Sequence, residues 1–159
     1  MPGTGPIIAG VFPGQPVVVR RAAELAASLG VKLVCAYVDI SSYSASDSNE
    51  PAELRLIDPD GVYDDDEVTD GMKQNLSRTL AIYGIEWSFQ IVSGEPARAL
   101  GRLGEHIDAS MIVVGTREHG FTHRLEELVV GSVAVHLTHH QHRPVLVVPL
   151  NPQPSEGRR

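Results

Sequence analysis

Two short segments carry the residue types best suited to binding a phosphate group. The first is Gly115-Thr116-Arg117, which follows an apolar run, and the second is Gly131-Ser132, at the expected start of a helix. A helix start offers free N–H groups and the positive end of the helix dipole, which favour an anion. An arginine can donate two hydrogen bonds to one phosphate. These residues predict a phosphate site, with one alternative left open: Gly131 permits close packing and Ser132 caps the helix.

The spacing of apolar residues predicts the elements that would position these segments. Short apolar runs predict strands over 7–12, 31–38, 86–92, 111–114 and 145–148. Helical spacing predicts helices over 16–29, from about 66 to 83, from 96 through 107 and over 131–140. This alternation implies one doubly wound α/β domain of the Rossmann type, over residues 1–150, with a five-stranded parallel sheet and right-handed crossovers. A ligand of such a sheet binds beyond the carboxyl ends of the strands, here 10–14, 38–40, 92–95 and 115–117.

Length and charge narrow the class of protein. The chain has 159 residues, the size of one domain, and a formal net charge of -7. Nucleic-acid binding needs a basic surface, and no apolar run reaches the roughly 20 residues that cross a bilayer. Cys35 is the single cysteine and lies in an apolar run, which indicates a reducing compartment. We therefore expect a cytoplasmic protein without nucleic-acid or membrane partners, and a disordered tail over 151–159.

The segment from Met111 to Pro149 resembles the C-terminal signature of the universal stress protein family. The matching residues are Val113-Val114-Gly115-Thr116-Arg117, Val130-Gly131-Ser132-Val133 and Pro144-Val145-Leu146-Val147-Val148. A weaker likeness extends back to Ile7. The resemblance implies a five-stranded parallel sheet, a homodimer and, as in many members, bound ATP.

The resemblance also implies which residues would hold an adenine nucleotide, ATP or AMP, at the carboxyl end of the sheet. The base pocket would lie near Gly10, Val11 and Val38. The phosphates and ribose would be held by Gly115, Thr116, Arg117, Gly131, Ser132 and Val133, with Gly120 as a displaced glycine of the intervening loop.

The chain departs from the family's ATP-binding pattern in two places. Members that bind ATP space their glycines as G-x2-G-x9-G-S/T, and counting from Gly115 puts Glu118 at the second position. If Gly120 is the second glycine, the spacing misses by about one residue and Arg117 stands where the first glycine belongs. Those members also carry an Asp just after the first strand, where this chain has Phe12. Two hypotheses follow: a stress-response protein that binds an adenine nucleotide, or a nucleotide-free dimeric interaction and regulatory module.

Other features suggest further alternatives. His136, His139 and His140 share a helical face, but polar and cationic residues suit a helix C-terminus, so we expect no metal site. The sequence lacks a nucleophile elbow and a P-loop, so no catalytic residue is assigned, and weak ATP hydrolysis by a small hydrolase stays open. The Ser-rich loop over 39–65 receives no role.

The final apolar segment, Val145 to Leu150, predicts the interface of a homodimer. In the strand order that the family implies, this strand lies at a sheet edge. It carries no charged residue, and an uncharged apolar edge is a liability unless it is covered or paired. A two-fold partner that offers the same strand in antiparallel orientation would pair it.

Overall fold

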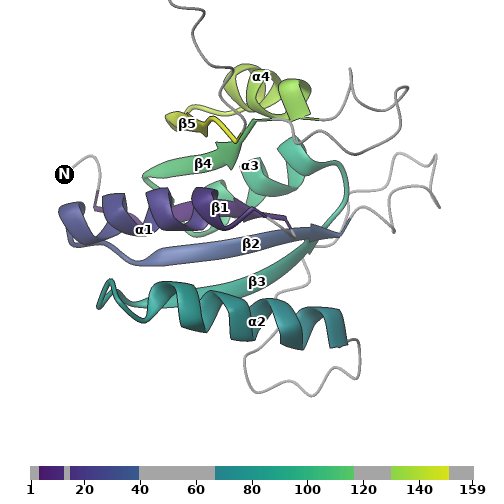
Figure 1. Ribbon diagram of the computed structural model, residues 1–159. Helices are drawn as coiled ribbons and strands as arrows, with labels where there is room; N and C mark the ends of the chain where they lie inside the picture. Colours follow the sequence, from purple (N-terminus) through teal and green to yellow (C-terminus); the bar gives the residue numbers. More distant parts are fainter. Residues whose placement is uncertain (1–3, 13–14, 40–66, 117–129, 151–159) are drawn as a thin grey trace, which may run out of the picture.

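Five parallel strands form one sheet in the order β3-β2-β1-β4-β5 (Figure 1). The computed structural model describes residues 4–12, 15–39, 67–116 and 130–150, with the backbone alone at 67–68 and 130–132. The strands are β1 (Ile7–Val11), β2 (Leu33–Asp39), β3 (Trp87–Ser93), β4 (Met111–Gly115) and β5 (Val145–Val148). The predicted doubly wound α/β architecture is confirmed.

Helices cover both faces of the sheet. On one face lie α1 (Pro16–Leu29) and α2 (Glu67–Leu80), and on the other lie α3 (Pro96–His106) and α4 (Val130–His140) (Figure 1). The chain runs outward from β1 to β3, then returns past β1 to form β4 and β5. Right-handed crossovers in these two opposite directions place successive helix pairs on opposite faces. The change of direction puts the topological switch between β1 and β4.

The two cores are built from alternate residues of the same strands. Ile7, Ala9 and Val11 of β1 are buried against the α1/α2 side, whereas Ile8 is buried against the α3/α4 side. Every residue of β1 is buried because β1 has a strand on either side and helices on both faces. The edge strand β5, by contrast, exposes Leu146 and Val147.

Helix ends explain where the observed boundaries differ from the expected ones. Gly30 adopts a left-handed conformation (φ 66°), and Val31 donates its N–H to the carbonyl of Ala26 at 3.0 Å. Val31 thus completes the cap of α1, and β2 begins at Leu33 rather than at 31. Likewise α2 ends at Leu80, and a turn over 81–84 leads to β3.

Some sequence expectations concern residues that the structure leaves undescribed. Residues 40–65 of the Ser-rich loop, the positions Arg117, Glu118 and Gly120, and the tail 151–159 lie outside the described residues. Within the described part, no helix combines the length and apolar character needed to span a bilayer.

Candidate functional site

The carboxyl ends of the strands bring the predicted ligand-binding segments to one edge of the sheet. In a parallel sheet each helix begins at the edge where the preceding strand ends. The N-terminal ends of α1, α3 and α4 therefore lie at this edge, after β1, β3 and β4 respectively (Figure 1). The edge includes the switch between β1 and β4, which is where ligands of such sheets bind.

Three of the expected site residues belong to the core between the sheet and α3/α4. Val38 and Val133 are 1% and 4% exposed, and both lie in this core. A Cβ at Gly10 would lie 3.3 Å from Val114 Cγ1 and 3.4 Å from Leu100 Cδ1, so this position admits no side chain without movement. These three residues pack against protein atoms in the core next to the carboxyl edge of the sheet.

Two others lie on the opposite face of the sheet. Val11 is buried in the α1/α2 core. A Cβ at Gly115 would lie 2.9 Å from Val18 Cγ2, 3.0 Å from Leu150 Cδ1 and 3.2 Å from Gln15 Oε1. The close approach that Gly115 permits is therefore to the start of α1 and to Leu150, two residues after β5. The predicted site residues are divided between the two faces, and only the carboxyl edge of the sheet joins them.

Thr116 anchors the chain beyond β5. Its backbone N–H donates to the carbonyl of Val148 at 2.9 Å, and its Oγ1 accepts the N–H of Leu150 at 2.8 Å. A hydroxyl that accepts one hydrogen bond can still donate its own hydrogen. Thr116 thus holds the two adjacent strand ends together and keeps a donor at the edge.

The starts of α3 and α4 differ in what they offer to an anion. Glu95, the N-cap of α3, accepts hydrogen bonds from Ala97 N at 3.2 Å and Arg98 N at 2.8 Å. A carboxylate therefore already occupies the anion position of α3. The first turn of α4 contains Gly131 and Ser132, as the sequence predicts.

A contact that the sequence did not reveal joins α3 to α4. His136 Nδ1 lies 3.9 Å from Glu95 Oε1, between residues far apart in the chain. The rings of His136 and His140 lie edge to face, with centroids 6.0 Å apart. In the described part of the chain, no three or more His, Cys, Asp or Glu side chains gather closely enough to hold a metal ion.

Cys35 is buried in the α1/α2 core. Burial disfavours the charged thiolate and raises the pKa of Cys35 to about 12. Its thiol is therefore neutral at physiological pH and unsuited to nucleophilic chemistry.

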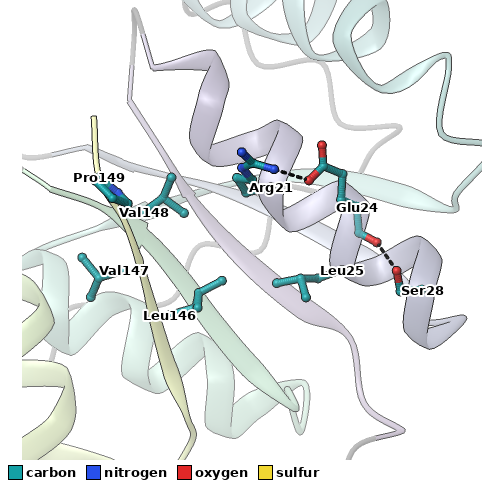
Figure 2. A pocket seen from close by; sticks show the side chains of 8 residues that line it. All are labelled: Arg21, Glu24, Leu25, Ser28, Leu146, Val147, Val148 and Pro149. Carbon is teal, nitrogen blue, oxygen red and sulfur yellow. Dashed lines mark hydrogen bonds and ion pairs between the residues drawn. The ribbon is translucent and has the colours of Figure 1, made fainter. Parts of the chain in front are cut away.

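An open groove of about 460 Å³ lies between α1 and the edge strand β5. Figure 2 shows Leu25 of α1 facing Leu146 of β5 across it. The polar residues at its rim bond within α1: Arg21 pairs with Glu24 at 2.9 Å, and Ser28 Oγ donates to the Glu24 carbonyl at 2.9 Å. What the groove offers a partner is mainly apolar surface beside the edge strand β5. The full lining is Arg21, Glu24, Leu25, Ser28, Leu146, Val147, Val148 and Pro149.

Comparisons with known proteins agree on one family. The profile of the universal stress protein family matches residues 6–149. A universal stress protein solved in complex with cAMP superposes with a TM-score of 0.65 at 18% identity, over 94% of this chain and 99% of that one. One from Archaeoglobus fulgidus in complex with dAMP gives 0.56 at 19% identity, over 93% and 99%. A family protein from Arabidopsis thaliana with AMP bound gives 0.51 at 16% identity, over 96% and 97%.

No curated protein sequence matches this chain significantly. At these identities the solved structures establish the fold. The family profile spans nearly the whole chain. The chain therefore belongs to the universal stress protein family.

Proposed function

We propose that this chain binds an adenine nucleotide, ATP or AMP, at the carboxyl edge of the sheet, with the phosphates at the start of α4. The observation that carries the proposal is the contrast between two helix starts. The Glu95 carboxylate fills the α3 start, whereas the first turn of α4, beside the switch between β1 and β4, contains Gly131 and Ser132 and no acidic residue. The backbone N–H groups of this turn therefore suit a phosphate.

The solved relatives support the class of ligand. Three of them are described as complexes with cAMP, dAMP and AMP, which share an adenine base and at least one phosphate. Because the sequence identity is only 16–19%, the proposed ligand of this chain has to be argued from its own residues.

Each residue at the edge has a distinct task in this proposal. The N–H groups of Gly131 and Ser132 would donate to phosphate oxygens, and Thr116 would add its hydroxyl hydrogen. Arg117 would supply a positive charge, and Gly120 would let the loop backbone approach the ligand. Gly10, Val11, Val38, Gly115 and Val133 would shape the wall behind the ligand through their packing. We assign none of them a catalytic role.

Melting curves with a matched pair of variants test this proposal. A ligand at 100 times its dissociation constant stabilises the native state by about 2.7 kcal/mol. For a domain of this size that raises Tm by roughly 5–10 °C. We expect this shift with millimolar ATP or AMP, and its loss in Gly131→Glu, which adds a negative charge at the phosphate position.

The control is Gly71→Glu, which makes the same charge change in α2 where a new Cβ meets no atom within 4 Å. It should keep the full shift. An unchanged Tm of the wild-type protein with every adenine nucleotide, together with a denaturing extract free of nucleotide, would refute the proposal. The alternative, a nucleotide-free interaction and regulatory module, would then take its place.

A specific observation also favours a homodimer through β5. This strand lies at the sheet edge, and Leu146 and Val147, on its two opposite faces, are 37% and 42% exposed. An antiparallel copy of the same strand would pair with this edge, and the groove beside α1 would receive apolar side chains of the partner. We propose that the dimer forms over Val145 to Leu150.

Light scattering of charged variants tests the interface. The wild type should give twice the chain mass of 17.2 kDa, and Val147→Lys or Leu146→Lys should shift it toward monomer. Ile82→Lys, at an 82% exposed apolar residue just after α2, should leave the mass unchanged. A monomeric wild type at tens of micromolar, or a dimer unaffected by both β5 variants, would exclude this interface.

We further propose a stress-response role, in keeping with the family to which the chain belongs, and a place in the cytoplasm, because the buried Cys35 thiol suits a reducing compartment. Fractionation of cells before and after stress would test both points. Recovery outside the cytoplasm, or an amount that no stress changes, would contradict them.

A further inference from the structure

The exposed face of α4 presents a pair of histidines that the proposed nucleotide site does not use. His136 and His140 are one helical turn apart, and both are exposed. Their rings approach edge to face at an interplanar angle of 77° with centroids 6.0 Å apart. His136 lies six positions after Val130, the first residue of α4, a distance of about 9 Å along the helix axis. The pair therefore lies beyond the first turn of α4, where the phosphates are placed.

The spacing of the two rings suits a shared metal ion. An imidazole nitrogen binds Zn²⁺ at about 2.0–2.1 Å, which places the ring centroid roughly 3 Å from the ion. Two rings on one ion then have centroids roughly 4.5 to 6.5 Å apart, depending on the nitrogen–metal–nitrogen angle. The observed separation of 6.0 Å corresponds to a wide angle of roughly 140°, so rotation of the two exposed side chains would bring both rings to the narrower angles, roughly 90–110°, at which they bind one ion.

The carboxylate of Glu95 lies near one of the two rings. Its Oε1 lies 3.9 Å from His136 Nδ1, while the same carboxylate is held by the N–H groups at the start of α3. This distance is longer than a hydrogen bond, so Glu95 lies beside the ring of His136 without fixing the position of its hydrogen.

We propose that His136 and His140 form a two-imidazole site for a divalent transition-metal ion. Imidazole ligands suit Cu²⁺, Ni²⁺ and Zn²⁺, whereas Mg²⁺ and Ca²⁺ prefer oxygen ligands. Within the described ranges no third His, Cys, Asp or Glu completes a closed cluster. The proposal departs from the expectation of no metal site that the sequence alone supports, because the structure places the two rings next to each other at the surface. It also goes beyond the proposed nucleotide binding.

Calorimetric titration of the untagged full chain with Cu²⁺ and with Ni²⁺, in the absence of nucleotide, tests this site. The chain has seven histidines, so variants must identify those that bind. We expect His136→Gln and His140→Gln each to weaken the tightest binding step at least about tenfold, because each removes one of two ligands. Mg²⁺ should give no binding step of comparable affinity.

His139→Gln is the matched control, since His139 lies on the same helix and is also exposed. It should keep the wild-type affinity within about twofold. Equal loss in His139→Gln, full affinity in either pair variant, or no binding of Cu²⁺ or Ni²⁺ to the wild type would overturn the proposal. Far-UV circular dichroism of all variants separates lost ligation from lost fold, and a misfolded variant is replaced by the corresponding alanine substitution.

Discussion

Replacing Gly115 by alanine probes how tightly the sheet, α1 and the chain after β5 meet. The added Cβ would lie 2.9 Å from Val18 Cγ2 and 3.0 Å from Leu150 Cδ1, closer than carbon atoms pack without strain. Val18 is fully buried, so it cannot turn away into solvent. Gln15 Oε1, at 3.2 Å, belongs to a longer side chain that can move.

Overpacking of a well-filled core by one methyl group costs about 1–3 kcal/mol. Because Val18 is held between α1 and the sheet, we expect Gly115→Ala to lose stability in this interval. For a domain of this size the loss corresponds to a fall in Tm of roughly 2–12 °C. The fall should occur without any nucleotide, because the clash is with protein atoms.

Urea unfolding and calorimetry of the ligand-free protein measure this effect. The control Gly71→Ala adds a methyl group inside α2 where nothing lies within 4 Å. Alanine is favoured over glycine in a helix by roughly 0.5–1 kcal/mol, so this variant should be slightly more stable than the wild type. If ligand-free Gly115→Ala has the same Tm as the wild type, the role of Gly115 is not to permit close packing.

Two further predictions concern the cap of α3 and the buried thiol. Glu95→Ala should lower the free energy of unfolding by about 1 kcal/mol, because Ala97 N and Arg98 N lose their acceptor. The control Glu105→Ala, at an exposed position on the same helix, should have no measurable effect. Equal stability of the two variants would contradict the capping role. Burial raises the pKa of Cys35 to about 12. At pH 8 a thiol reagent should therefore modify Cys35 only as fast as the protein unfolds. Rapid modification of the native protein would contradict this burial. The unfolded thiol ionises near pH 8.5, so stability should be unaffected by Cys35 below that pH and should fall as pH rises toward 12, a decline that Cys35→Ala should reduce.

The sequence predicted the architecture because each signal was local and repeated. Apolar runs with no polar alternation indicated strands buried on both faces, and Pro16 and Gly30 marked the ends of α1 as observed. The expected edge position of β5 is confirmed by the strand order. The apolar run over 31–38 predicts a strand that includes Val31, but the N–H of Val31 belongs to the helix cap.

The site was less predictable because its contacts join distant segments. A glycine at position 115 allows a close approach, yet no local pattern shows that Val18 and Leu150 are the neighbours. The approach of His136 to Glu95 depends on how α3 and α4 pack, and the spacing of either residue carries no sign of it. The sequence does indicate the start of α3, since an acceptor side chain followed by proline, here Glu95 and Pro96, is typical of a helix start.

Amide chemical shifts of the ¹⁵N-labelled protein during titration with ATP test the phosphate position most directly. The proposed position predicts that the largest changes fall on Gly131 and Ser132 at the start of α4. The amides of Ala97 and Arg98, already bonded to Glu95, should change little and serve as an internal reference. Largest changes at Ala97 and Arg98 or elsewhere in the chain, or no change at millimolar ATP, would contradict the central claim.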